Sequence, residues 1–412
     1  MTISGYLSRD NSRKAGLLLL SAGMFILIAG YNLYPDGSSY HTGYYLLFLL
    51  AGLACVSTDP GTAAALLKSP LARVAVFFLL TIAIAQLYPG TVTRPASELQ
   101  KLALILLSLL IIGQFVAGNA VLFGRIMIAA VVAVGLIALL QLYTFYILEA
   151  HAFSVRLHGS FIPENPLYLA QSFGFFFVAA VCLASGNRHR LPVLLLMTAA
   201  AAVLAFAAVA TQSRGFVVAS MVALILPFLG SERKTAVLVL VSVLIMFAAV
   251  LYLNPAMLER HEFYRLLIWK KSLALICERP LFGWGSDYYP AIRLEGLSRQ
   301  LRDTHNILLT IWLKYGALAF VGLAVLLVYA VRTSLARSGS ATLRLGGALL
   351  VFGVTMLFFE GHNIISKPNS TWHMIWIPLG IIMGARFACC RQQGTESGQP
   401  DRQSRQLSGA PG

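Results

Sequence analysis

The stretch from Leu191 to Ala210, LPVLLLMTAAAAVLAFAAVA, decides the fold because it carries no charged side chain over the length of a membrane span. An α-helix needs about twenty consecutive apolar residues to cross the hydrocarbon core of a bilayer. The run is rich in leucine, alanine and valine and does not alternate apolar with polar residues. A helix is therefore favoured over a strand of a membrane barrel, and we interpret residues 191–210 as a transmembrane helix.

Composition extends this interpretation to the whole chain. Of its 412 residues, 58% are hydrophobic and only 11% are charged, whereas a soluble protein carries roughly a quarter charged residues. The sequence predicts an all-α polytopic membrane protein with about 12 transmembrane helices. The candidate spans are Ala15–Tyr34, Thr42–Thr58, Val74–Leu87, Leu102–Ala117, Ile126–Ile147, Pro166–Ser185, Leu191–Ala210, Phe216–Leu229, Thr235–Leu253, Asn306–Val331, Leu345–Phe359 and Trp372–Ala385.

The charged residues indicate how these spans are oriented. The net charge is +15, but membrane proteins concentrate Lys and Arg in cytoplasmic loops, so we expect no nucleic acid partner. If the N-terminus is cytoplasmic, most cations fall in inner loops, and both termini are then expected in the cytoplasm. These inner cations are Arg9, Arg13, Lys14, Lys68, Arg73, Arg125, Arg188, Arg190, Arg233, Lys234, Arg332, Arg337, Arg344, Arg386 and Arg391.

The two ends of the chain and the interfacial aromatics complete the topology. The first apolar run lacks a small-residue cleavage site and is interpreted as a retained helix. Trp372 and Trp376 begin the last span and are expected in an aromatic belt at its outer end. Residues 391–412 are rich in Gln, Ser, Gly and Pro, so we expect a disordered cytoplasmic tail after a bundle that comprises residues 1–390.

A long polar segment, residues 254–305, lies between the ninth and tenth spans and is expected on the outer side. Its Met257–Leu275 portion interleaves apolar and charged residues, which predicts an amphipathic helix that lies on the membrane or covers the bundle. The Pro and Gly residues of Arg279-Pro280-Leu281-Phe282-Gly283-Trp284-Gly285 end that helix and predict a tight turn.

Arg214 is the first candidate for chemistry, within the polar connection Thr211-Gln212-Ser213-Arg214-Gly215. An arginine at this level can simply extend to water at the membrane interface. It can also bind an anion, because its planar fork of donors matches phosphate oxygens. Gly215 beside it allows a ligand to approach the backbone closely.

Arg265 and His305 lie in the outer segment on the same expected side of the membrane. An arginine in an amphipathic helix is often only solvated, and a histidine at the start of a helix is often structural. Asp303 lies two residues before His305 and would orient its imidazole as a base. Thr304 or Asn306 can cap the helix that follows.

Further polar residues on this side are candidates for supporting roles. They are Arg156, Gln212, Asp303, Asn306 and Glu360. The sequence contains neither a phosphate-binding loop with Gly-Lys-Ser/Thr nor a His-Glu-x-x-His motif, so we expect chemistry without a metal ion or another cofactor.

Four blocks in this order resemble the O-antigen ligase and polymerase superfamily. They are Thr211-Gln212-Ser213-Arg214-Gly215, Arg265 with Trp269, Arg279-Pro280-Leu281-Phe282-Gly283-Trp284-Gly285, and Thr304-His305-Asn306 followed by Trp312 and Tyr315-Gly316. The resemblance covers roughly residues 156–376, and the first five spans match only in length and hydropathy.

The resemblance implies a multi-spanning, GT-C-like glycosyltransferase of the Gram-negative inner membrane with a periplasmic active site. Its donor would be O-antigen polysaccharide on undecaprenyl pyrophosphate, and its acceptor a sugar hydroxyl of lipid A-core, with membrane lipids around it. The essential histidine of the family maps onto His305, and its pyrophosphate-binding arginines map onto Arg214 and Arg265.

These assignments give a consistent mechanism. Pyrophosphate is a good leaving group, and two arginines can neutralise its developing charge without a metal ion. His305 would remove the proton of the acceptor hydroxyl as a general base. A direct attack of this kind inverts the anomeric centre.

Other activities remain open at this point. A polymerase that joins repeat units and a protein O-oligosaccharyltransferase of the same superfamily would use the same donor chemistry with another acceptor. A transporter for lipid-linked glycans would also need arginines near a cavity, but it should show inverted repeats and broken helices near the midplane. The sequence shows neither, and its polar groups cluster on one side.

Overall fold

The fold is a bundle of membrane-length helices. The computed structural model describes residues 3–34, 36–88, 94–160, 165–228, 241, 248, 263–293, 301–335, 340–361 and 363–397. Ten helices in these ranges are long and apolar enough to cross a membrane, which confirms the all-α polytopic fold. A shorter apolar helix, α10 (Arg214–Phe228), matches the eighth predicted span. The ninth, Thr235–Leu253, lies outside the described residues except for positions 241 and 248.

The first half of the bundle contains five spans. The second span is assembled from α2, a π-helical segment η1 and α3, and the fifth from α7 and the π-helical segment η2. The elements are α1 (Ile3–Leu33), α2 (Gly37–Gly43), η1 (Tyr44–Leu50), α3 (Ala51–Thr58), α4 (Pro60–Leu67), α5 (Pro70–Leu87), α6 (Pro95–Gly118), α7 (Ala120–Tyr143) and η2 (Thr144–Leu148).

The second half contains the remaining spans, together with α10 and α13 (Phe263–Glu278), which are not among the ten spans. The spans are α8 (Pro166–Gly186), α9 (Leu191–Ala210), α14 (Ile307–Ser334), α15 (Ala341–Glu360), and α16 (Ser370–Met374) together with α17 (Trp376–Ser397). Helix α17 continues to Ser397, so the first residues of the tail expected to be disordered are helical, and the rest lie outside the described residues.

Local sequence explains where many of these helices begin. Helices α4, α5, α6, α8 and α9 carry Pro in their first turn, where a missing N–H costs no hydrogen bond. The side chains of Asp59, Ser69 and Asn165 cap α4, α5 and α8 by accepting a backbone N–H.

The two tryptophans of the last span are core residues, and their expected place in an interfacial belt was wrong. Trp372 and Trp376 are both fully buried. Their indole N–H groups donate to the backbone oxygens of Ser366, at 3.0 Å, and Ile364, at 2.9 Å. The irregular segment before α16 supplies those carbonyl oxygens, so the rings pack inside the bundle with their polar atoms satisfied.

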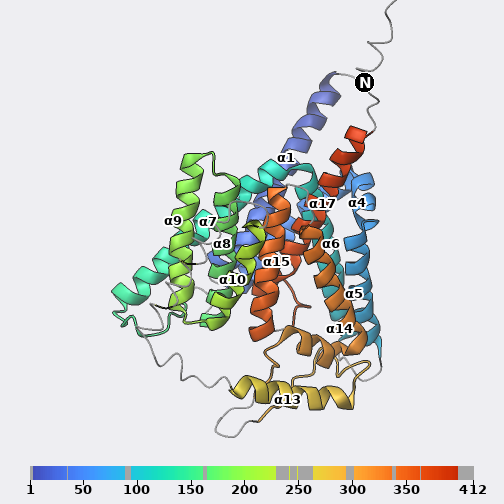
Figure 1. Cartoon of the computed structure of the whole chain (residues 1–412). Coiled ribbons are helices and arrows are strands. Elements are labelled where there is room, and N and C mark those ends of the chain that lie inside the picture. The colour runs from blue at the N-terminus through green and yellow to red at the C-terminus, as the bar shows by residue number, and fades with distance from the viewer. Residues whose placement is uncertain are drawn as a thin grey trace, which may run out of the picture.

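Helix α13 (Phe263–Glu278) crosses the end of the bundle at which α14 begins and α15 ends (Figure 1). It corresponds to the predicted amphipathic helix and buries Ile268, whereas Leu266 is exposed. The turn that follows attaches it to α14, because the N–H groups of Trp284 and Gly285 donate to the carbonyls of Leu313 and Lys314. Helix α13 therefore covers the end of the bundle.

A kink in α14 makes this attachment possible. Gly316 has φ 81°, a left-handed conformation inside an otherwise regular helix. A Cβ at Gly316 would overlap the carbonyl oxygen of Leu281. Only glycine satisfies both the backbone conformation and the close approach.

We predict that Gly316→Ala destabilises the protein by about 2 kcal/mol or more, because it combines left-handed strain with a backbone clash. The melting temperature of the purified protein in detergent measures this loss. Gly124→Ala is the matched control, since a Cβ at Gly124 meets nothing within 4 Å. Equal melting temperatures of the two variants would contradict the account of the kink.

Candidate active site

The residues singled out from the sequence gather at the end of the bundle that α13 covers. Arg214 is the first residue of α10, Arg265 lies in α13, and Glu360 is the last residue of α15. His305 immediately precedes Asn306, the N-cap residue of α14. Four elements that are distant in sequence therefore deliver one candidate residue each.

Glu360 is the buried carboxylate that connects two of these elements. Its Oε1 lies 3.5 Å from Nη2 of Arg265, and its side chain is only 3% exposed. The Arg265 guanidinium also lies 5.9 Å from the ring centroid of Phe359. A buried charge is costly without a partner of opposite sign, so this ion pair ties α13 to the end of α15.

The first turn of α10 adjoins the same carboxylate. A Cβ on Gly215 would lie 3.7 Å from Oε1 of Glu360 and 3.6 Å from Sδ of Met356. Gly215 follows Arg214 directly, so the backbone that carries Arg214 and the guanidinium of Arg265 approach one carboxylate from two sides.

Gly361 brings the start of α14 to this place. A Cβ at Gly361 would overlap the backbone nitrogen of Ile307, so the end of α15 and the beginning of α14 are in backbone contact. His305 lies two residues before Ile307. The backbone that follows His305 therefore lies against the residue next to Glu360.

The turn around His305 is held by a dense set of hydrogen bonds. Asn306 is the cap, as one of the two sequence alternatives predicted: its Oδ1 accepts from the N–H groups of Leu308, at 2.9 Å, and Leu309, at 3.2 Å. The hydroxyl oxygens of Thr304 and Thr310 are 2.7 Å apart. Asp303 Oδ1 accepts from the backbone N–H of His305 at 3.4 Å, so this bond fixes the turn and not the imidazole.

Backbone conformation marks two candidate residues. Among the described residues, the non-glycine positions with positive φ are Ala150, Gln212 and His305, at 54°, 54° and 51°. Such conformations cost on the order of 1–3 kcal/mol and concentrate at functional sites. At His305 the surrounding hydrogen bonds maintain the strained conformation, which presents a partly exposed imidazole at the mouth of α14.

Arg156 and Gln212 support the turn that precedes Arg214. Arg156 Nε donates to the carbonyl of Thr211 at 2.6 Å, and Gln212 Nε2 donates to the carbonyl of Ser154 at 2.9 Å. The N–H of Leu157 also donates to Ala210. These bonds lock the loop before α8 onto the α9–α10 turn, so both side chains position the backbone of that turn.

A buried lysine is the residue that sequence reasoning missed. Lys314 is 6% exposed, donates to the carbonyl of Ser286 at 2.8 Å, and lies 4.4 Å from the ring centroid of Tyr289. It lines a cavity of about 240 Å³ together with Arg302, Asp303 and Asn363. The cavity therefore lies beside the turn of His305. In the sequence, Lys314 stands out as a single cation inside the apolar run of the tenth predicted span, and this could have identified it.

The aromatic turn between α13 and α14 contributes packing. The Arg279 guanidinium lies 4.4 Å from the ring centroid of Trp284, and Tyr288 stacks on the same indole. Partial burial raises the pKa of the Tyr288 phenol, and the Glu278 carboxylate adds to the effect. Arg279, Trp284 and Tyr288 therefore form one stacked cluster in this turn.

Comparison with known proteins finds similarity to O-antigen ligases. A family model described as O-Antigen ligase matches residues 199–324, which include Arg214, Arg265 and His305. The chain is 28% identical over 394 residues to an O-antigen ligase of Pseudomonas aeruginosa, an alignment that covers 94% of this chain and 96% of that protein.

We predict that alanine is tolerated at Gly215 and not at Gly361. A methyl group at Gly215 would meet its neighbours at ordinary van der Waals distance, whereas one at Gly361 would overlap the backbone of α14. Melting temperatures in detergent should fall by several degrees for Gly361→Ala only. A stable Gly361→Ala variant would contradict the contact that brings the histidine turn to Glu360.

Proposed function

We propose that this chain is an O-antigen ligase, which transfers O-antigen polysaccharide from undecaprenyl pyrophosphate to a sugar hydroxyl of lipid A-core; its similarity to the O-antigen ligase family model and to the Pseudomonas aeruginosa protein supports this. An enzyme with this activity is a glycosyltransferase. The observation that supports the finer proposal is the ion pair of Arg265 with Glu360, next to which lie the backbone of Gly215, which follows Arg214, and the start of α14, which follows His305.

The two arginines suit the pyrophosphate of the donor. A guanidinium offers a planar fork of donors that binds two phosphate oxygens at once. Glu360 orients Arg265 from a distance of 3.5 Å, and the pyrophosphate would compete with that carboxylate for the same cation. Charge that develops on the leaving oxygen is then stabilised by fixed cations.

His305 is proposed as the general base. Its imidazole takes the proton of the acceptor hydroxyl while that oxygen bonds to the anomeric carbon and the carbon–oxygen bond to pyrophosphate breaks. The electron pair of the broken bond remains on the phosphate. A single displacement inverts the anomeric centre, and NMR coupling constants of the product linkage would reveal retention if the scheme were wrong.

The cavity beside Lys314 is proposed to receive the acceptor. It shares Asp303 and Thr304 with the histidine turn and is lined by hydroxyl, amide and cationic groups, which can bind sugar hydroxyls and the phosphates of a lipid-bound core. Donor and acceptor would thus approach His305 from opposite sides, the arginine side and the lysine side.

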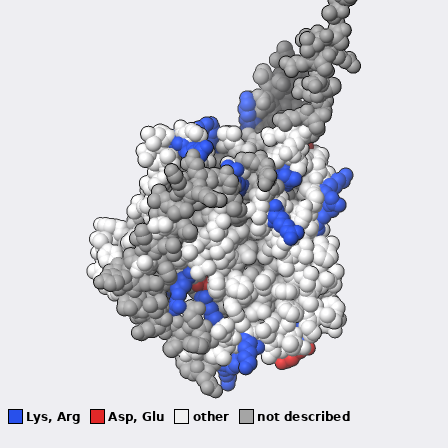
Figure 2. All heavy atoms as spheres, in the orientation of Figure 1, with Lys and Arg blue, Asp and Glu red and all other residues white. Residues whose placement is uncertain are grey.

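The proposed orientation rests on the charge bias of the predicted loops. Lys and Arg side chains occupy the upper part of the molecule and the lower end near α13, with mainly uncharged surface between them on the right-hand side (Figure 2). The helical start of α1 lies at the end opposite α13 (Figure 1). We propose that this opposite end is cytoplasmic, with both termini, and that α13 and the site face the periplasm from the inner membrane.

His305→Asn should reduce the rate of transfer by about 10²–10⁴-fold, the usual contribution of a general base. Asparagine tolerates the left-handed backbone at this position, so folding should be preserved. In the assay, purified enzyme is incubated with lipid-linked glycan and lipid A-core, and the product is detected by its mobility on a gel. His151→Asn at the same end serves as control, and wild-type activity in His305→Asn would refute the assignment.

Arg214→Lys and Arg265→Lys should each lower kcat/KM for the donor at least about tenfold, because an ammonium group cannot reproduce bidentate phosphate binding. Arg293→Lys, an exposed position after α13, should behave as wild type. Full activity in either lysine variant would show that charge alone is needed at that position.

Transfer should continue after the enzyme and substrates are treated with EDTA, because the proposed scheme stabilises the leaving group with arginines. The measurement compares initial rates before and after chelation and after Mg²⁺ or Mn²⁺ is restored. Activity that is lost with EDTA and regained with a metal ion would contradict this part of the mechanism.

A further inference from the structure

A second cationic cavity lies at the end of the bundle opposite α13. Its volume is about 460 Å³, and it is formed where the start of α5, the end of α14 and residues 383–390 of α17 meet. Lys68, Arg332 and Arg386 line it, one from each of these three places. None of these residues belongs to the site proposed for glycan transfer.

The charges of this cavity are of one sign. Among the described residues that line it, there is no Asp or Glu, and none of the three cations takes part in a salt bridge found within the described ranges. The cavity also adjoins the N-terminus of α5, an 18-residue helix that starts at Pro70 after the Ser69 cap. A helix N-terminus adds partial positive charge. Like charges around one hollow repel one another unless an anion neutralises them.

Most of the remaining lining is apolar. Leu71, Tyr329, Met383 and Phe387 contribute hydrophobic surface. The third span starts at Pro70 and α14 ends at Ser334, so Lys68 and Arg332 lie near the ends of membrane-length helices, whereas Arg386 lies within the span Ser370–Gln393. Basic pockets between transmembrane helices suit anionic phospholipids.

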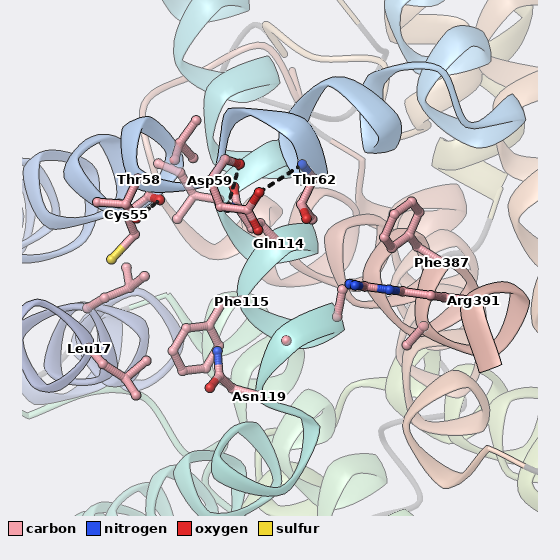
Figure 3. Close-up of a pocket in the computed structure, with 17 residues that line it drawn as sticks. Leu17, Cys55, Thr58, Asp59, Thr62, Gln114, Phe115, Asn119, Phe387 and Arg391 are labelled. Carbon is pink, nitrogen blue, oxygen red and sulfur yellow. Dashed lines mark hydrogen bonds between the residues drawn. The ribbon is translucent and has the colours of Figure 1, made fainter. Parts of the chain in front are cut away.

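A neighbouring cavity of about 270 Å³ differs from this one in the charges of its lining residues (Figure 3). Phe387 lines both cavities. In the neighbour, Arg391 is accompanied by the Asp59 carboxylate and by the amides of Gln114 and Asn119. Asp59 caps α4 through the N–H of Thr62, and Gln114 Nε2 donates to the Asp59 carbonyl. That lining carries charges of both signs, whereas the charged residues that line the cavity of Lys68, Arg332 and Arg386 are all cations.

We propose that the cavity of Lys68, Arg332 and Arg386 binds the phosphate of an anionic phospholipid, whose acyl chains lie against the apolar lining. The site would fasten α5, α14 and α17 together at the membrane surface remote from glycan transfer. It is independent of the transfer chemistry, so either proposal can fail without the other.

Native mass spectrometry of the full chain in detergent tests this assignment with phosphatidylglycerol as the titrant. We expect one saturable site that prefers phosphatidylglycerol to phosphatidylcholine. Each substitution, Lys68→Gln, Arg332→Gln or Arg386→Gln, should weaken it about fivefold, as expected for about 1 kcal/mol per cation. Arg190→Gln, an exposed arginine before α9, should bind as wild type.

Three results would overturn the proposal: unchanged affinity in the triple variant, equal affinity for phosphatidylcholine, or complete displacement of the lipid by millimolar inorganic phosphate. A second measurement needs no cation substitution. Cys390 lines the cavity, and in a Cys277→Ser, Cys389→Ser background phosphatidylglycerol should slow its reaction with a maleimide several-fold. An unchanged rate would also overturn the assignment.

Discussion

The buried ion pair between Glu360 and Arg265 is the constraint on which the covered end of the bundle depends. Glu360 ends α15 with its carboxylate almost fully removed from water, and Arg265 reaches it from α13. A carboxylate in that position requires a cationic neighbour, so α13 must lie across the bundle. The same carboxylate adjoins Gly215 at the start of α10. One interaction thereby brings together the cations proposed to bind the donor.

The backbone next to Glu360 extends this arrangement to the proposed base. Gly361 touches the start of α14, and Asn306 and Thr304 fix the turn in which His305 adopts a left-handed conformation. The site is thus formed by helix ends and capped turns whose backbones contact one another. Fixed geometry of this kind suits electrostatic stabilisation of a transition state, which requires charges that are already in place. The proposed lipid cavity at the opposite end of the bundle shares α14 with this site.

Features that depend on local sequence could be predicted. The apolar runs predicted the spans. The residue types at the start of α14 predicted the Asn306 cap, and the interleaved apolar and charged residues of Met257–Leu275 predicted the helix observed as α13. The burial of Lys314, Trp372 and Trp376 could not be predicted, because each depends on carbonyl oxygens or rings supplied by distant segments. The pairing of Arg265 with Glu360 joins residues almost a hundred positions apart, which no periodicity specifies. Arg156 and Gln212 were recognised as polar candidates, but only the structure reveals that they hold a backbone turn.

The identity of the acceptor is the central claim that a single reconstitution can decide. Purified enzyme in proteoliposomes would receive radiolabelled glycan on undecaprenyl pyrophosphate together with equal amounts of lipid A-core and unlabelled lipid-linked glycan. The account predicts that the label moves to lipid A-core in one step, with no lengthening of the carrier-bound glycan. Label that accumulates in longer chains on the carrier, with lipid A-core unmodified, would contradict the ligase assignment and identify a polymerase.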